Sequence, residues 1–328
     1  MREKQMFNWK DKNVFVTGGN GFLGSWLVSD LLKKGANVTC IIRDSVANSN
    51  LQLLGIMDKI NVVAGTIEDY RTVERAMNEH EAEVCFHLAA QAIVGIANKS
   101  PISTFETNIK GTWNVLEACR QLQIKKTVVA SSDKAYGEHK QLPYKEEFPL
   151  NGLTPYEASK SCTDILARAY AKTYELAVAV TRCGNIYGGG DLNMSRIIPG
   201  TIKSVLNNEQ PIIRSDGTPV RDFIYVLDAV SAYITLAEQL GRKEIAGEAF
   251  NFGTEQPVSV LELVKKITAA AGKSMQPHIL NEAKNELAAQ YLDWSKAKKV
   301  LGWAPKYNLD ASLKETIEWY RKFLGESK

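Results

Sequence analysis

The chain has 328 residues, of which 45% are hydrophobic and 23% are charged, an ordinary composition for a globular protein. Its formal net charge of +3 gives no reason to expect nucleic acid or an acidic membrane surface as a partner. No apolar run approaches the roughly 18 residues of a membrane-spanning helix, and the five scattered cysteines predict a reduced, cytoplasmic compartment without disulfides.

The first element, residues 13–24, predicts a strand, a glycine turn and the start of a helix. Val14, Phe15 and Val16 form an apolar strand, and a helix is expected over residues 25–34. A glycine turn lets the backbone approach a pyrophosphate, and the helix that follows offers free N–H groups. We therefore expect a bound dinucleotide, in contact with Gly18, Asn20, Gly21, Phe22, Leu23 and Gly24.

The end of the second expected strand, residues 37–42, bears on the choice of cofactor. A carboxylate there usually holds the adenosine ribose, whereas an arginine suits a 2′-phosphate. Ile42 stands where the acid is expected, and Arg43 and Asp44 follow it. The pattern favours NADP weakly and leaves NAD open, with both Arg43 and Asp44 as expected contacts.

Two more strands continue the alternation. Residues 60–64 lead to the expected adenine contacts, and the strand that starts at Val84 runs through His87 into small residues that leave room for a ligand. His87 is either a satisfied core residue or a functional one. A helix over residues 104–122 has an apolar stripe suited to the core or to a subunit interface. The expected cofactor contacts in this part are Thr66, Ile67, Leu88, Ala89 and Ala90.

The stretch from residue 127 to residue 160 organises the expected site. Its buried strand ends in Ser132, Asp133 and Lys134, and ligands of open α/β sheets bind beyond the carboxyl ends of strands. Tyr156 and Lys160 are four residues apart, which places both on one face of a helix. A neighbouring ammonium would lower the pKa of the phenol, so that Tyr156 could take a proton from a sugar or alcohol hydroxyl.

Strands and helices alternate up to about residue 180, which predicts an α/β fold with a Rossmann-type doubly wound parallel sheet. The pattern then changes, and we expect a smaller, interleaved α/β lobe. The predicted dinucleotide-binding part is 1–181 with about 221–255, and the predicted second lobe is 182–220 with 256–328. Four histidines without paired spacing give no reason to expect a metal.

Taken together, these motifs resemble the extended short-chain dehydrogenase/reductase family over nearly the whole chain, and within it the nucleotide-sugar epimerases and dehydratases. The resemblance implies that Ser132, Tyr156 and Lys160 are catalytic and that Lys160 also binds the nicotinamide ribose. It implies a homodimer built as a four-helix bundle from residues of about 102–122 and 157–174. The implied substrate contacts are Gln91, Asn185, Arg196 and Arg221. The family resemblance rests on residues 17–24, 87–90, 131–132 and 136–137, Tyr156 with Lys160, Arg182 with Asn185, and Arg221 with Asp222.

The pair Asp133-Lys134 resembles that of CDP-glucose-type sugar-nucleotide 4,6-dehydratases and of some enzymes acting on UDP-N-acetylglucosamine. The resemblance implies a lyase that forms an NDP-4-keto-6-deoxyhexose from CDP- or UDP-linked glucose or N-acetylglucosamine, with tightly bound, recycled NADP or NAD. Lys134 would remove the C5 proton, and Asp133 would protonate the departing C6 hydroxyl. A 4-epimerase, an NADPH-dependent reductase and a sensor of the dinucleotide ratio are the alternatives, and a surface salt bridge is the non-catalytic interpretation of the pair.

The sequence departs from the family pattern in two further places. Thr66 replaces an aspartate that often contacts adenine. Residues 285–293 lack a basic residue common in uridine-type epimerases, which leaves the nucleotide base undecided.

Overall fold

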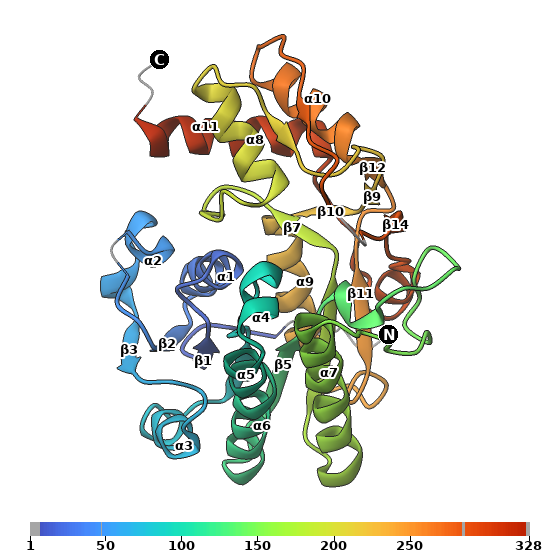
Figure 1. Cartoon of the computed structure of the whole chain (residues 1–328). Coiled ribbons are helices and arrows are strands. Elements are labelled where there is room, and N and C mark those ends of the chain that lie inside the picture. Colours follow the sequence, from blue (N-terminus) through green and yellow to red (C-terminus); the bar gives the residue numbers. More distant parts are fainter. Residues whose placement is uncertain (1–6, 47, 284–285, 326–328) are drawn as a thin grey trace.

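The computed structural model describes residues 7–46, 48–283 and 286–325, so residue 285 of the segment just mentioned lies outside it. Its centre is a seven-stranded sheet in the order β11-β6-β5-β4-β1-β2-β3, in which every pairing is parallel (Figure 1). This is the doubly wound α/β fold that the sequence predicts. The strands are β1 (Asn13–Thr17), β2 (Asn37–Ile42), β3 (Asn61–Ala64), β4 (Val84–His87), β5 (Lys126–Ala130), β6 (Val178–Cys183) and β11 (Ala249–Phe252).

The central strands are short apolar runs because both faces of the sheet are covered. Val14 of β1 pairs with Val38 of β2 on one side and with Val84 of β4 on the other, and all three side chains are buried. Because the strands run the same way, their carboxyl ends meet along one edge of the sheet. The residues that follow the strands are therefore brought together there.

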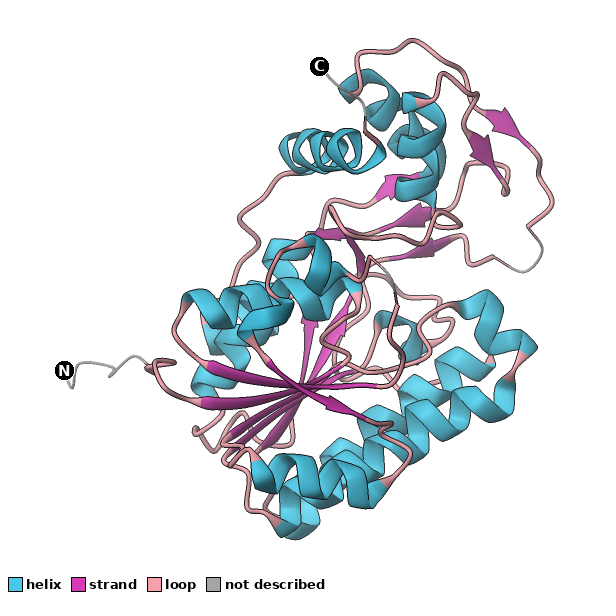
Figure 2. Cartoon of the chain, turned by 90° about the vertical axis from the view of Figure 1, so that its left-hand side faces the viewer, coloured by secondary structure: helices cyan, strands magenta, loops and turns pink. Residues whose placement is uncertain are grey.

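Helices pack on both faces of this sheet (Figures 1 and 2). Leu27 of α1 and Val230 of α9 belong to the core on one face, and Val73 of α3, Leu116 of α6 and Ala167 of α7 belong to the core on the other. The bounds are α1 (Phe22–Lys33), α3 (Tyr70–Glu79), α6 (Gly111–Gln121), α7 (Pro155–Tyr174) and α9 (Val226–Gln239), with α2 (Asn50–Leu53), η1 (Met57–Lys59) and α4 (Val94–Lys99) in the connections.

The helix expected over residues 104–122 is interrupted. It consists of α5 (Pro101–Phe105), a π-helical turn η2 (Glu106–Lys110) and α6. Inside the turn, the backbone oxygen of Asn108 accepts hydrogen bonds from the Thr112 and Thr163 hydroxyls. These side-chain donors compete with the helical ladder, which accounts for the wider turn at this position.

The second lobe consists of small sheets and three helices with their own core, in which Ile202 of α8, Leu263 of α10 and Ile317 of α11 are buried. The pairs are β7 with β10, β12 with β9 and β14, and β13 with β8. Both β11 and α9 follow the first segment of this lobe in sequence, yet they join the large sheet, so the chain crosses between the lobes. The elements of this lobe are β7 (Asn185–Tyr187), α8 (Ile197–Leu206), β8 (Ile212–Ile213), β9 (Val220–Arg221), β10 (Phe223–Tyr225), β12 (Val258–Ser259), α10 (Val260–Ala270), β13 (His278–Ile279), β14 (Ala289–Gln290) and α11 (Leu309–Leu324). The π-helical η4 (Ala297–Leu301) packs instead against α9 and β11. The lobe boundaries given above stay a prediction.

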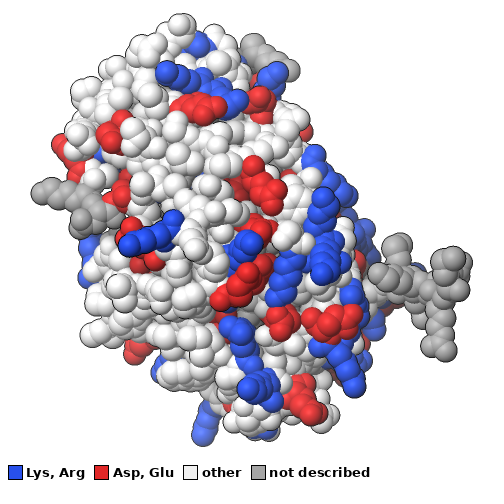
Figure 3. Space-filling view, turned by 90° about the vertical axis from the view of Figure 1, so that its right-hand side faces the viewer, with Lys and Arg blue, Asp and Glu red and all other residues white. Residues whose placement is uncertain are grey.

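Acidic and basic side chains are interspersed on the face drawn in Figure 3. Within the described residues, none of the helices has the length and apolar character needed to cross a membrane. The five cysteines are free thiols, and four of them are buried.

Candidate active site

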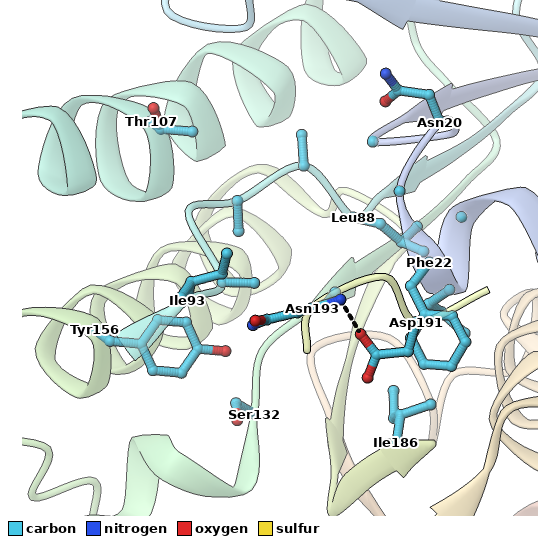
Figure 4. A pocket seen from close by; sticks show the side chains of 18 of the residues that line it. Asn20, Phe22, Leu88, Ile93, Thr107, Ser132, Tyr156, Ile186, Asp191 and Asn193 are labelled. Atoms are coloured by element: carbon cyan, nitrogen blue, oxygen red, sulfur yellow. Dashed lines mark hydrogen bonds between the residues drawn. The ribbon is translucent and has the colours of Figure 1, made fainter. Parts of the chain in front are cut away.

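A cavity of about 800 Å³ lies at the carboxyl edge of the large sheet, where the second lobe borders it. Figure 4 shows the Tyr156 phenol pointing into this cavity, with Ser132 beside its lower edge. The structure thus gathers around one space all of the expected cofactor contacts, all of the expected catalytic residues and two of the expected substrate contacts, Asn185 and Arg196.

The glycine turn between β1 and α1 is built for close approach. Gly18 has a φ of +71°, and a Cβ there would stand 2.8 Å from the backbone nitrogen of Ala89. A Cβ on Gly24 would stand 2.1 Å from the backbone oxygen of Gly18. Gly21, at the N-cap of α1, has no side chain to occupy the first N–H groups of the helix. These features fit the pyrophosphate of a dinucleotide.

Arg43 and Asp44 both line the cavity at the end of β2. Arg43 Nε donates to Asp44 Oδ2 at 2.8 Å, and both side chains are 60% exposed. The guanidinium is therefore paired with its own neighbour, and a carboxylate lies at the position where the adenosine ribose is expected. This pairing gives no support to the preference for NADP.

His87 is a satisfied core residue. Its Nδ1 lies 2.8 Å from Thr17 Oγ1 and its Nε2 lies 3.0 Å from Thr112 Oγ1, and the ring is buried. Burial, aided by the charge of nearby Lys160, lowers the pKa of His87 to about 3. The ring is therefore neutral near pH 7, and of the two interpretations left open above the structure favours the first.

Residues 132–134, here called the acid–base turn, open the 3-10 helix η3 (Asp133–Tyr136) directly after β5. Ser132 Oγ donates to Asp133 Oδ1 at 3.0 Å and accepts from the backbone N–H of Lys134 at 3.2 Å. Lys134 Nζ donates to Asp133 Oδ2 at 2.9 Å. The Asp133 side chain is only 5% exposed, so this is not a surface salt bridge.

Tyr156 and Lys160 lie one turn apart on α7, as their spacing predicts. The helix begins with Pro155, and the Glu157 carboxylate accepts from the backbone N–H of Thr154 at 3.1 Å, which fixes the first turn. Both residues line the cavity and both are buried.

The expected lowering of the Tyr156 pKa by Lys160 is wrong for this structure. Lys160 Nζ donates to the backbone oxygen of Ala130 at 2.7 Å, and burial lowers the pKa of Lys160 to about 8. Burial raises the pKa of Tyr156 to about 12, while a hydrogen bond with Ser132 acts in the opposite direction and the charge of Asp133 adds to the rise. Removal from water outweighs the charge effects because the phenol is enclosed.

A second cavity of about 690 Å³ adjoins the first, since Asn185 and Arg196 line both. Arg196 Nη1 donates to Asp191 Oδ2 at 2.6 Å, so its guanidinium is held between the two spaces. Arg221 lines only the second cavity, where its Nη2 lies 3.0 Å from Glu286 Oε1. The expected substrate contacts Asn185, Arg196 and Arg221 therefore follow one continuous path.

Gln91 is not brought into the lining of either cavity. Its side-chain oxygen accepts from the backbone N–H of Ile93 at 3.1 Å, and its backbone is held by the side chain of Asn108. The Gln91 side chain, which the resemblance assigns to the substrate, is thus hydrogen-bonded within its own turn.

Two residues near the site were missed from sequence. Asn108 Nδ2 donates to Ser159 Oγ at 2.9 Å and so connects η2 to the helix of Tyr156. Gln290 of β14 contacts Lys134 Nζ through its side-chain oxygen. Asn108 had a weak signal as a polar residue inside an apolar helix stripe. Gln290 had none, because it lies 156 residues from its partner.

The parallel sheet, the glycine turn and the paired Tyr156 and Lys160 define a nucleotide-binding α/β protein of the reductase type. The family model described as GDP-mannose 4,6 dehydratase matches residues 15–316. The CDP-glucose 4,6-dehydratase of Salmonella typhimurium is 33% identical, over 96% of this chain and 92% of its own.

Two solved structures extend the comparison. UDP-glucose 4-epimerase from Thermotoga maritima, solved with UDP-glucose, has a TM-score of 0.87 and 32% identity, over 95% of this chain and 99% of its own. dTDP-glucose 4,6-dehydratase from Bacillus anthracis, solved with NAD, has a TM-score of 0.83 and 30% identity, over 95% and 97%. The chain therefore belongs to the extended short-chain dehydrogenase/reductase family of nucleotide-sugar epimerases and dehydratases.

Proposed function

We propose that this protein is a nucleotide-sugar 4,6-dehydratase, which converts an NDP-hexose into an NDP-4-keto-6-deoxyhexose and water. The observation that carries the proposal is the acid–base turn. Asp133 and Lys134 are a hydrogen-bonded acid and base that line the same cavity as Tyr156. A 4-epimerase needs no second acid–base pair of this kind, because its chemistry stays at one carbon.

Tyr156, Lys134 and Asp133 would each carry out a different proton transfer in this reaction. Tyr156, with Ser132, takes the proton of the C4 hydroxyl as C4 becomes a ketone, which acidifies the proton on C5. Lys134 in its neutral form removes that C5 proton, and Asp133 in its protonated form gives a proton to the C6 hydroxyl, which leaves as water with formation of a C5–C6 double bond. Lys134 returns the proton to C5 when C6 takes up the hydride. When bound, the nicotinamide would accept a hydride from C4 and return it to C6, so that no external reductant is consumed.

Proton transfer to Tyr156 needs the phenolate, and burial alone opposes it. A cationic nicotinamide ring beside the phenol would favour the phenolate. We therefore infer that Tyr156 acts as a base only in the loaded enzyme, while the empty site keeps the phenol protonated.

We infer that the cofactor is NAD. Asp44 stands at the end of β2 and lines the cavity, where a carboxylate suits ribose hydroxyls and repels a 2′-phosphate. The similar dehydratase structure with NAD supports this choice. The substrate is a CDP- or UDP-linked glucose or N-acetylglucosamine, whose diphosphate would lie between Asn185, Arg196 and Arg221.

We also propose a homodimer formed by α5, η2, α6 and α7. Apolar side chains on these helices are exposed, among them Ile102 (75%), Ile165 (56%) and Trp113 (43%). Burying them against a second copy would form the expected four-helix bundle. Sedimentation of the wild type beside Ile165→Glu tests this: a dimer that the substitution turns into a folded monomer supports it, and a monomeric wild type rejects it.

The experiment for the activity is incubation with single sugar nucleotides followed by mass spectrometry. A product lighter by one water supports the dehydratase. An unchanged mass with inversion at C4 identifies a 4-epimerase, and consumption of added NADPH identifies a reductase.

A further inference from the structure

Gln290 joins the second lobe to the acid–base turn. It belongs to β14, is about 1% exposed, and reaches the end of β5. Its side-chain oxygen accepts from Lys134 Nζ, and its Nε2 donates to the backbone oxygen of Asp133 at 3.1 Å. One amide therefore holds both the Lys134 nitrogen and the backbone of residues 132–134.

Lys134 needs such a partner because its side chain is a flexible stem with several rotatable bonds. In its neutral form Lys134 has two N–H donors, and Asp133 and Gln290 accept from them. The lone pair of the nitrogen then remains for the cavity, which Lys134 lines. The two partners together fix where the nitrogen stands relative to a bound sugar.

The segment that precedes Gln290 borders the second cavity through Glu286. In the parallel pairing of β14 with β9, Gln290 lies in register with Arg221. Four residues earlier, Glu286 pairs with the Arg221 guanidinium. The segment from Glu286 to Gln290 thus contacts Arg221 of the expected diphosphate site at one end and Lys134 at the other.

We propose that Gln290 is a positioning residue that holds Lys134 and Asp133 in the geometry for elimination, so that the acid–base pair is complete only when β14 is docked. This inference rests on the proposed dehydratase function. Gln290 itself transfers no proton, because a neutral amide keeps its hydrogens throughout.

The test separates the two halves of the reaction in the holoenzyme. In Gln290→Met, which keeps the length of the side chain and removes both hydrogen bonds, C4 oxidation should proceed as in the wild type. Elimination should slow by about 100-fold, the cost of a small misplacement of a reacting group. Reduced nicotinamide should therefore accumulate during a single turnover, seen as a rise in its near-ultraviolet absorbance.

Two further substitutions keep the test decisive. Gln290→Glu retains an acceptor for Lys134 but adds a negative charge that favours the ammonium, so elimination should recover only as the pH rises, a pH dependence that a purely structural role would not produce. If Gln290→Met fails to fold, Gln290→Asn, which is too short to reach Lys134, should show the same accumulation. Gln210→Met is the matched control, since the Gln210 amide donates to the backbone oxygen of Gln276 on the exposed surface.

Unchanged dehydration in Gln290→Met and Gln290→Asn would overturn the inference and leave the dehydratase standing. Equal loss of oxidation and elimination in all three variants would also overturn it. A wild-type protein that never forms a dehydrated product would remove the proposed function and this inference with it.

Discussion

Arg182 and Asp164 form a buried ion pair with two hydrogen bonds behind the acid–base turn. Arg182 Nε lies 2.7 Å from Asp164 Oδ2, and Nη2 lies 2.9 Å from Oδ1, with side chains 1% and 0% exposed. Arg182 Nη1 also donates to the Tyr136 hydroxyl at 2.7 Å. Because Tyr136 ends η3, the pair ties β6 and α7 to the element that carries Asp133.

We predict that Asp164→Asn lowers the free energy of unfolding by about 3–5 kcal/mol, the cost of leaving one buried charge without its partner. The double variant Asp164→Leu with Arg182→Met should be more stable than Asp164→Asn, because it leaves no charge unpaired. Urea unfolding followed by circular dichroism measures both. A single variant as stable as the wild type would contradict this description of the pair.

For the acid–base turn, we predict that Lys134→Ala retains oxidation at C4 and loses elimination. Reduced nicotinamide should then form without release of water, because the C5 proton has no base. Tyr156→Phe should lose both halves of the reaction, by about 10²–10⁴-fold, the usual contribution of a general acid–base group. Lys140→Ala, on an exposed lysine of the following loop, serves as the control. Full dehydratase turnover in Lys134→Ala would show that Lys134 is not the base that removes the C5 proton.

The local parts of this site could be predicted because they depend on residues near one another in sequence. The turn at Gly18 and Gly24, the strand end at Ser132, and the helical spacing of Tyr156 and Lys160 all follow from short-range patterns. The structure brings each of them to the expected cavity.

The parts that were missed depend on tertiary contacts. The Tyr156 pKa is raised because distant elements enclose the phenol, and the Lys160 amine bonds to Ala130 of a neighbouring strand. The side chain of Asn108 holds the backbone of Gln91 away from the cavity, and Gln290 reaches the site from β14. No local pattern encodes burial or a partner so far along the chain.

Lys160 makes the stability of the cofactor-free protein depend on pH. Its pKa falls from 10.5 to about 8 because the amine is buried. Between these values the unfolded chain binds more protons than the native one, so the free energy of unfolding rises with pH, by about 3 kcal/mol over the whole interval. Below pH 8 this gain is absent.

Lys160→Met removes this titration. The difference in unfolding free energy between wild type and Lys160→Met should therefore grow in favour of the wild type between about pH 8 and pH 10. The comparison ends at about pH 10. Above it, buried tyrosines such as Tyr156 lower the free energy of unfolding, because they lose their protons more readily in the unfolded chain. Parallel profiles for the two proteins would contradict the depressed pKa of Lys160.

For the cofactor, we predict that NAD binds more tightly than NADP and that Asp44→Ala narrows the difference. Loss of hydrogen bonds to a charged group costs about 1.5–3 kcal/mol, so NAD binding should weaken by about 10- to 100-fold. Calorimetric titration with each dinucleotide measures the change. Tighter binding of NADP to the wild type would reverse the assignment and return the decisive role to Arg43.

The central claim is that one hydrogen moves within the sugar from C4 to C6 while water leaves. The most direct measurement uses a CDP- or UDP-hexose carrying deuterium at C4, with mass spectrometry and NMR of the product. The dehydratase assignment predicts a product that has lost water and carries the deuterium at C6. Deuterium that remains at C4 in a sugar of unchanged mass would contradict it.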